Sequence, residues 1–527
     1  MRRACRIALI ACIAAAAQPA CAALVLYRGA YGQPESLVPN QSGVKSEQTI
    51  MLDLFEGLTS FSADGRVIPG AAQSWQVSGD GRSWTFSLRP GLRWSDGSPL
   101  GASDWVYAWR RMFTPATALP RASRMFIIRH SREVLAGRLP PGELGVSAPD
   151  AVTVRLELEN PLPWLPLLLA GQEGTPLPQK VVEKLGAQWT RPGNLVSNGA
   201  FRLTERRAGG TVQLGRNPFF HDAARVTLDA VIYVPSDDTS ALVNRFRARE
   251  LDINAWPGFA PRQQQALRKE LGAAVRIAPL FGVRFLRFNL KRAPFDDIRI
   301  RRALALLVDR ELLVRKVLPG GERPSYRVVP EGLGDDAAPP RGELQLGSMA
   351  ERSARARALL AEAGFRTRRP GPVRLRVPSG NGEEMCLAVA AMWSAAGVPT
   401  VVEKSEIKSL IADLRRGDFD IALTGAAENA SVEGYLERFL ADSSYNSGQY
   451  RSAAFEQALR KAQSLSAPAE RRAAVAQAES ILNADHAVVP LIQEVARNLV
   501  SSRVGGWADN PDDIHLSRYL SLQQIAR

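Results

Sequence analysis

The chain contains Ser83-Trp84-Thr85-Phe86-Ser87-Leu88-Arg89, followed by Ser95-Asp96-Gly97-Ser98 and then Trp105-Val106-Tyr107-Ala108-Trp109. Apolar and polar residues alternate along residues 83–89, which predicts a half-buried β-strand. Residues 95–98 predict a turn, because Asp and Gly tolerate the backbone angles of tight turns. We expect Asp104 to cap a helix on which two tryptophans share one face. The stretch therefore predicts a strand, a turn and a helix packed around a tryptophan-rich core.

Outward from this stretch, strand and helix patterns interleave along the chain without an internal repeat. Two short apolar runs, residues 201–204 and 212–214, predict a hairpin across Gly209-Gly210. Apolar residues at helical spacing predict helices over residues 300–308, 354–363, 455–465 and 469–482. The Pro- and Gly-rich residues 332–347 predict a loop. The chain is therefore predicted to be a mixed α/β protein.

Composition excludes several classes of protein. The chain has 527 residues, of which 45% are hydrophobic and 23% charged, so it is neither disordered nor fibrous. Its formal net charge is +14, but the basic residues are scattered along the chain. This distribution favours weak attraction to anionic surfaces or acidic partners and predicts no nucleic-acid groove.

The N-terminus has the pattern of an export signal. Arg2, Arg3 and Arg6 precede an apolar stretch over residues 7–17, and Ala20-Cys21-Ala22 is a small-x-small cleavage motif. We expect cleavage after Ala22 and a soluble protein in the periplasm. Acylation of Cys21 is the alternative, although the chain lacks the Leu that a lipoprotein signal places three positions upstream. No later run of about 18 apolar residues predicts a membrane span.

The sequence contains few candidate catalytic or metal-binding motifs. The mature chain carries one cysteine, Cys386, and its four histidines are dispersed, so we predict no internal disulfide, no metal site and no cofactor. Two SxxK matches, residues 42–45 and 405–408, leave an exported serine hydrolase as the weakest alternative, because a lysine one helical turn away can activate a serine. Neither match is followed by the KTG partner of that class. We therefore predict a protein that is not an enzyme.

The order of longer motifs identifies a family. The chain resembles the family 5 extracellular solute-binding proteins, the oligopeptide- and dipeptide-binding receptors of ABC importers. The matching segments are Ala72-Gln73-Ser74-Trp75, residues 80–89, 94–99 and 105–109, Leu54-Phe55-Glu56-Gly57-Leu58, Ser197-Asn198-Gly199-Ala200-Phe201, Arg216-Asn217-Pro218-Phe219-Phe220, residues 294–304 with Asp309-Arg310, and residues 359–365. The segment at 197–201 is similar to the oligopeptide- and murein-tripeptide-binding subgroup in particular.

This resemblance implies an α/β, two-lobed periplasmic-binding-protein fold of class II with an additional domain on the first lobe. Residues 1–22 would be the signal peptide. Lobe I would gather residues 23–54, 179–281 and 495–527, the additional domain would be residues 55–178, and lobe II would be residues 282–494. Each crossing between lobes can absorb a small backbone rotation, so the boundaries suit a hinged clamp.

The ligand site is where this chain departs from the family pattern. In the oligopeptide subgroup a Trp-Cys-Ala-Asp-Tyr segment supplies an aspartate that pairs with the α-ammonium of the peptide. Here the corresponding segment reads Thr424-Gly425-Ala426-Ala427-Glu428-Asn429-Ala430. The resemblance implies Glu428 as the ammonium anchor if the loop is one residue shorter, whereas an ungapped alignment places Asn429 there.

Other pocket positions differ as well. Gly425 stands where the family has a tryptophan, Ile407 aligns with a second pocket tryptophan, and Arg121 aligns with a tyrosine that contacts the peptide. Val44, whose backbone would pair with the peptide main chain, is retained. The loss of aromatic walls weakens a promiscuous peptide pocket, while Arg121 offers a donor for a carboxylate. That Glu428 is a solvated loop residue and Arg121 a surface side chain remain alternatives.

We therefore expect a monomeric periplasmic receptor that captures a peptide or peptide-like ligand and delivers it to an inner-membrane ABC permease. The alternative within the same fold is a receptor for a non-peptide solute, such as an opine, a glycoside or a metal chelate. The departures at Gly425 and Ile407 favour that alternative.

Overall fold

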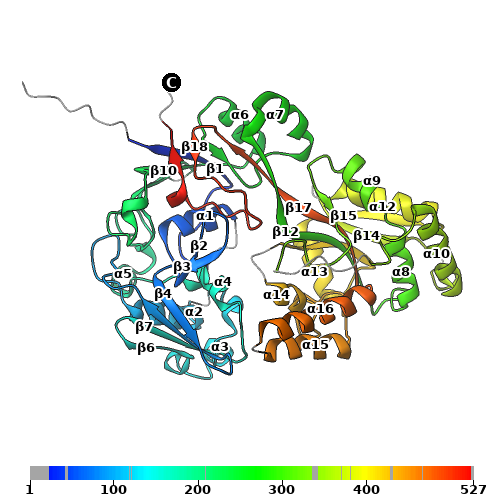
Figure 1. Cartoon of the computed structure of the whole chain (residues 1–527), viewed down its shortest axis with the longest axis horizontal. Helices are drawn as coiled ribbons and strands as arrows, with labels where there is room; N and C mark the ends of the chain where they lie inside the picture. Colours follow the sequence, from blue (N-terminus) through cyan, green and yellow to red (C-terminus); the bar gives the residue numbers. More distant parts are fainter. Residues whose placement is uncertain are drawn as a thin grey trace, which may run out of the picture.

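Two lobes are joined by two long strands, β12 (Val275–Phe288) and β17 (Val488–Val500), drawn in green and orange-red in Figure 1. The computed structural model describes residues 23–41, 45–117, 119, 121–207, 209–334, 342–369, 371–379, 382–427, 431–465 and 467–523. Secondary structure is mixed throughout, as the sequence predicts, and the two-lobed α/β fold is confirmed.

A large sheet passes through both lobes, and β12 and β17 lie at its centre. These two strands pair antiparallel, but their register shifts between Pro279 and Val283. Before the shift β12 pairs with residues 495–499, and beyond it with residues 488–493. The strand order is β15 (Thr400–Ser405), β14 (Val373–Pro378), β16 (Ile421–Ala427), β12, β17, β11 (Ile253–Asn254), β1 (Val25–Tyr31), β10 (Ala230–Ser236), β9 (Val212–Arg216) and β8 (Phe201–Arg206), with β13 (Arg323–Pro324) beside β17.

Lobe I is built on β1 and β8–β11. Strand β1 pairs parallel with β10 and β11, and the predicted hairpin is confirmed as the antiparallel pair β8–β9. Helix α6 (Thr239–Arg247) begins after Asp238, whose carboxylate accepts a hydrogen bond from the Ser240 N–H at 2.7 Å. The other helices of this lobe are α1 (Lys45–Leu54), α5 (Gln179–Leu185) and α7 (Gln264–Leu271).

The additional domain contains the tryptophan-rich residues 83–109. Its antiparallel sheet has the order β4 (Ala72–Val77), β5 (Ser83–Leu88), β7 (Thr153–Glu157) and β6 (Val146–Asp150). Every second residue of β5 is buried, which confirms the predicted strand. Helix α2 (Ala102–Phe113) buries both predicted tryptophans, but it begins after Gly101. Asp104 therefore lies in the first turn, where its carboxylate accepts the Gly101 N–H at 2.9 Å, and the predicted cap position is wrong.

The additional domain and lobe I share one hydrophobic core. Leu26 and Ile50 of lobe I belong to the same buried cluster as Trp84, Trp105 and Leu156 of the additional domain. The helices α3 (Ser131–Leu135) and α4 (Leu165–Leu169) of the domain pack on this cluster. The short strands β2 (Thr59–Phe61) and β3 (Val67–Pro69) contribute Phe61 and Val67 to a smaller cluster with Ile514 and Leu516. Because apolar burial continues across the boundary, the two parts form one packed unit.

Lobe II is built on β14–β16, and its helices lie on the right of Figure 1. The predicted helices are confirmed as α8 (Ile298–Leu306), α10 (Met349–Glu362), α15 (Ala453–Ser464) and α16 (Pro468–Ala484). Helix α10 starts earlier than predicted, because Ser348 and Glu351 form a capping box before it. Also in this lobe are α9 (Arg310–Leu312), α11 (Phe365–Arg368), α12 (Glu383–Ala395), α13 (Ile407–Arg416) and α14 (Val432–Glu437).

The export signal at residues 1–22 and part of the predicted loop, residues 335–341, lie outside the described residues. Among the helices that the structure describes, none combines the length and apolar character needed to cross a membrane.

Candidate ligand-binding site

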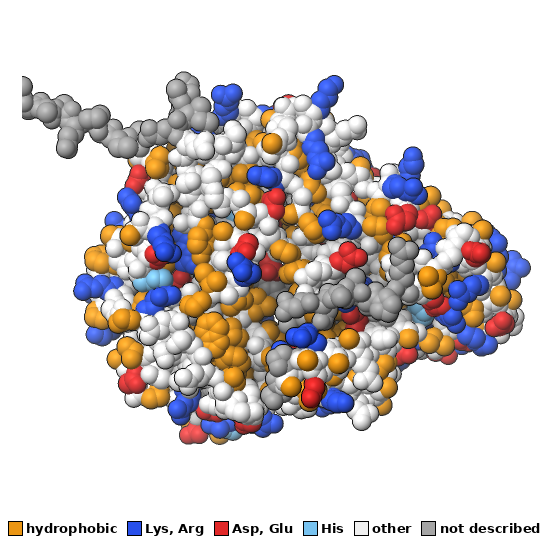
Figure 2. Space-filling model, in the orientation of Figure 1, with side chains coloured by type: hydrophobic (Ala, Val, Ile, Leu, Met, Phe, Trp, Pro, Cys, Tyr) orange, Lys and Arg blue, Asp and Glu red, His pale blue; other side chains and the backbone are white. Residues whose placement is uncertain are grey.

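A cavity of about 490 Å³ lies where lobe I, the additional domain and the strands β12 and β17 meet. Its charged lining residues fall into three groups, which we call the domain wall (Arg121, Arg124 and Glu173), the strand wall (Arg284 and Glu494) and the loop wall (Lys45 with residues 511–516). The Lys and Arg side chains elsewhere are spread over the visible face of the molecule (Figure 2). The cavity lining brings together charged residues of both signs from three parts of the fold.

The domain wall is organised by one buried carboxylate. Glu173 lies in the turn Gln172–Gly174, and its side chain is 3% exposed. Its Oε1 atom accepts hydrogen bonds from Arg121 Nη2 at 2.6 Å and Nε at 3.2 Å, and it lies 2.6 Å from Arg124 Nε. Two guanidinium groups are therefore fixed against one carboxylate oxygen at the edge of the cavity.

The tryptophans of α2 hold this turn in place. Trp105 Nε1 donates to the Gly174 carbonyl at 2.7 Å, and Trp109 Nε1 donates to the Glu173 carbonyl at 2.8 Å. Gly174 is required, because a Cβ atom there would lie 2.0 Å from the Leu169 carbonyl oxygen. The tryptophans are buried as the sequence predicts, and their indole N–H groups also position the charged wall.

The strand wall is an ion pair across β12 and β17. Arg284 Nε donates to Glu494 Oε1 at 2.9 Å, and each side chain is about one-quarter exposed, at 23% and 24%. Gly425 of β16 pairs with Arg284 in the sheet. A Cβ atom on Gly425 would lie 3.1 Å from Arg284 Cδ, so the missing side chain leaves room for the guanidinium.

The loop wall is held by the buried Asp513. This residue has a positive φ of 52°, and its Oδ1 accepts a hydrogen bond from Asn498 Nδ2 at 2.8 Å and lies 3.0 Å from His515 Nε2. Burial acts to raise the pKa of Asp513, but the hydrogen bond with His515 and the nearby charges lower it to about 2. Lys45 Nζ donates to the backbone carbonyl of Asp512 at 2.8 Å. The pKa of Asp512 shifts in the opposite direction. Burial raises it to about 6, and the charge of Lys45 only partly opposes that rise.

Only some of the predicted site residues lie at the cavity. Arg121 lines the cavity, and Gly425 lies against Arg284, which lines it. Ile407 is the first residue of α13, is 52% exposed and does not belong to the lining. Val44, Glu428 and Asn429 lie outside the described residues.

Sequence reasoning missed Arg284, Glu494 and Asp512. Arg284 sits in an apolar strand, where a single charge indicates only a half-exposed position. Glu494 and Asp512 belong to no recognisable motif, and only the fold brings them to the cavity.

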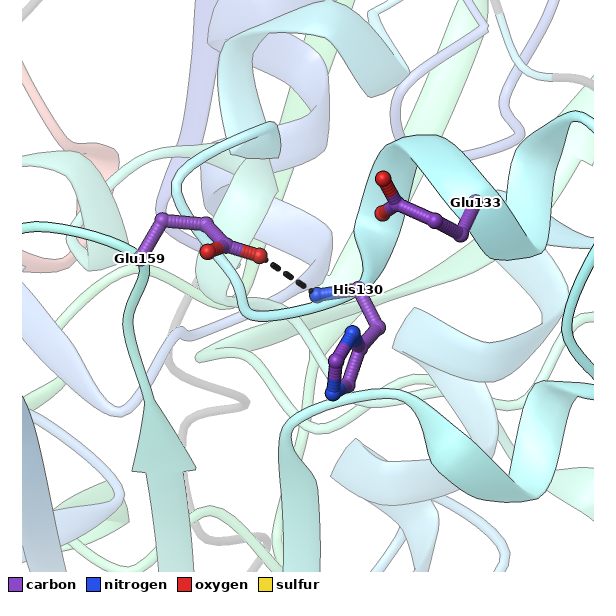
Figure 3. A group of neighbouring side chains, drawn as sticks. All are labelled: His130, Glu133 and Glu159. Carbon is purple, nitrogen blue, oxygen red and sulfur yellow. Dashed lines mark hydrogen bonds between the residues drawn. The ribbon is translucent and has the colours of Figure 1, made fainter.

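The first SxxK match cannot be placed, because Ser42 lies outside the described residues. In the second, Ser405 ends β15 and Lys408 lies exposed on α13. Within the described residues, one group has the composition of a metal site, namely His130, Glu133 and Glu159, whose potential ligand atoms lie within 4.8 Å of one another. It is on the additional domain and outside the cavity lining. Figure 3 shows that Glu159 meets the His130 backbone N–H, at 2.7 Å, instead of its ring.

Two lobes joined by paired strands, with a charged cavity where they meet, define a two-lobed solute-binding protein. Residues 66–447 match the family described as bacterial extracellular solute-binding proteins, family 5 Middle. The chain belongs to this family, as its motifs predict.

Similar proteins cover almost the whole chain. The periplasmic oligopeptide-binding protein OppA of Salmonella typhimurium is 34% identical over 498 residues, covering 93% of this chain and 91% of that protein. The probable deoxycholate-binding periplasmic protein YgiS of Escherichia coli is 33% identical over 500 residues, covering 94% and 92%. The structure of the murein tripeptide-binding protein MppA in its unliganded open form has a TM-score of 0.84 at 31% identity, covering 95% of this chain and 98% of that one.

Replacing Trp109 by Phe tests how the domain wall is held. The change leaves the buried Glu173 carbonyl without its donor, so we expect a loss of about 1–3 kcal/mol in the free energy of unfolding, measured by urea denaturation. Trp84→Phe is the matched control, because the buried Trp84 Nε1 has no hydrogen-bond partner among the described residues. An equal loss in both variants would show that ring volume matters and that the hydrogen bond does not.

Proposed function

We propose that this protein is a periplasmic receptor that captures a peptide or peptide-like ligand between its lobes and delivers it to an ABC permease in the inner membrane. The observation that carries the proposal is the charged cavity at the junction of the lobes, in a chain aligned over 93% of its length with an oligopeptide-binding protein. A peptide carries charged groups at both ends, so paired charges in a cleft suit it better than they suit an uncharged solute.

Arg121 is the proposed donor for a ligand carboxylate. The Nε and Nη2 atoms of Arg121 donate to Glu173, while Nη1 of Arg121 makes no hydrogen bond to the residues that the structure describes. Since Glu173 fixes the guanidinium plane, the remaining N–H groups are already oriented for an anion at the cavity.

A non-peptide ligand of the same fold remains the second candidate. It is favoured by Gly425 and Arg284, which place a charge where the family pattern has an aromatic wall, and by the relative named as a probable deoxycholate-binding protein. Opines, glycosides and metal chelates are the candidate non-peptide ligands. A screen that measures the binding of each of them and of peptides distinguishes the two candidate functions.

We also propose that the lobes hinge at the predicted boundaries 281/282 and 494/495. The register shift of β12 against β17 lies beside both positions and supports this assignment. An interrupted ladder bends more easily than a regular one, because fewer hydrogen bonds hold it in one geometry.

Peptide capture should be measurable as binding with closure. We expect calorimetry with a mixture of tripeptides to give saturable binding, and small-angle scattering to give a smaller radius of gyration once the ligand is bound. A ligand that contacts both lobes stabilises the closed state. Binding of an opine or a bile acid with no binding of peptides would replace the peptide assignment, and binding without compaction would contradict the clamp.

Export should leave a defined N-terminus. We propose that the mature protein begins at Ala23 and is soluble in the periplasm, so fractionation followed by mass spectrometry should recover that species. Recovery of the protein in the membrane fraction with an acylated Cys21 would contradict cleavage after Ala22 and establish the lipoprotein.

Glu428 stays a proposed anchor for a peptide ammonium, inferred from the family pattern. Replacing it by Gln should weaken a free-amine peptide about tenfold or more, because a desolvated ammonium then loses its charged partner. An N-acetylated peptide should be affected much less. Asn429→Ala is the control for the ungapped alignment. If Glu428→Gln binds the free-amine peptide within twofold of the wild-type affinity, Glu428 is a loop residue and not the anchor.

A further inference from the structure

Asp512 differs from the other acidic residues that line the cavity. Among the described residues, four carboxylates belong to the lining, and three have partners within the protein: Glu173 with the domain-wall arginines, Glu494 with Arg284, and Asp513 with Asn498 and His515. The Asp512 carboxylate accepts no hydrogen bond from the described residues, since the Lys45 ammonium donates to the Asp512 backbone carbonyl.

The surroundings of Asp512 make an added partner favourable. Burial raises the pKa of this carboxyl to about 6, and Lys45 offsets only part of the cost of desolvation. The group is therefore mostly ionised at neutral pH, yet it is poorly compensated. A donor with positive charge would remove much of that penalty.

The backbone around Asp512 is already fixed. Phe281 N–H donates to the Pro511 carbonyl at 2.9 Å, Asn510 exchanges two hydrogen bonds with the backbone of Ile514 at 2.8 and 3.1 Å, and Arg28 donates to the His515 carbonyl at 2.8 Å. The residues on both sides are therefore held by the rest of the protein. A binding group on such a loop loses little conformational entropy when a ligand arrives.

The same cavity also presents an aromatic ring. Trp256 belongs to the lining together with Asp512 and is 41% exposed, and Tyr31 packs edge-on against it with ring centroids 6.3 Å apart. Carboxylates and indole rings both attract organic cations, the first by charge and the second through its ring quadrupole. The cavity lining thus contains the two kinds of group that recognise an ammonium or a guanidinium.

We propose that Asp512 binds a positively charged group of the ligand, a primary ammonium or a guanidinium, at the loop wall of the cavity. The proposal rests on the proposed function, because it assumes that a peptide-like ligand enters this cavity. It is independent of Glu428, which belongs to the segment after β16 and not to this loop.

Calorimetry with three synthetic tripeptides tests the proposal. The probes are Ala-Lys-Ala, its norleucine analogue Ala-Nle-Ala, and N-acetyl-Ala-Lys-Ala, titrated into wild type, Asp512→Asn and Asp509→Asn. Asp509 lies on the same segment, outside the lining, and pairs with Arg276 at 3.9 Å, so it is the matched control. We expect Asp512→Asn to weaken at least one cationic probe about tenfold or more, and Asp509→Asn to change affinity less than twofold.

The pattern across the probes identifies the group that is bound. A loss confined to the two lysine peptides assigns the side-chain ammonium, and a loss confined to the two free-amine peptides assigns the α-ammonium. If Asp512→Asn stays within twofold of wild type for every probe that wild type binds, the proposal is wrong while the proposed function stands. If wild type binds no peptide, the proposed function fails and this proposal fails with it.

Proton release gives a second readout that a loss of structure would not imitate. The other charged or titratable residues of the lining are Lys45 on α1, Asp513 and His515 on the same loop, Arg284 on β12, Glu494 on β17, and Arg121, Arg124 and Glu173 of the domain wall. Because a cation favours ionised Asp512, wild-type affinity should fall as pH drops below about 6, and binding should release a proton there. An α-ammonium or lysine stays protonated in that range. An unchanged pH profile in Asp512→Asn would overturn the assignment.

Discussion

The antiparallel pairing of β12 with β17 holds the two lobes together. Each strand is long enough to belong to both lobes, so one ladder fixes how the lobes face each other. The ion pair of the strand wall joins the same two strands, since Arg284 belongs to β12 and Glu494 to β17. A change in the geometry of this pair would therefore alter both the opening of the cavity and its charge pattern.

The cavity follows a simple electrostatic rule. Charges taken out of water need partners, and most of those in the wall find them inside the protein. Glu173 has two guanidinium groups and Asp513 has Asn498 and His515, so these carboxylates serve mainly to hold their neighbours in position. Arg121 and Asp512 keep hydrogen-bonding capacity that no described residue uses.

The sequence predicted the scaffold well and the cavity poorly, for one physical reason. Strand β5, the β8–β9 hairpin and the helical pair α15–α16 are set by local periodicity, which a single chain displays directly. The wall contacts join residues far apart, with separations of 52 for Arg121–Glu173, 210 for Arg284–Glu494 and 467 for Lys45–Asp512. Gly425 illustrates the limit, because the sequence showed a missing tryptophan but not the arginine that lies in its place.

The position of β17 also determines when the chain can complete its fold. This strand is near the C-terminus, yet it sits between β12 and β11 in the middle of the sheet. Until residues 488–500 are available, β11 lacks one neighbour and β12 is left as an exposed edge. Contacts between such distant segments form slowly, because a long loop must close first. Most of the chain must therefore be synthesised before β12 and β17 can pair. Until then the 487 residues that precede β17 contain an unpaired strand that other chains or chaperones can recognise.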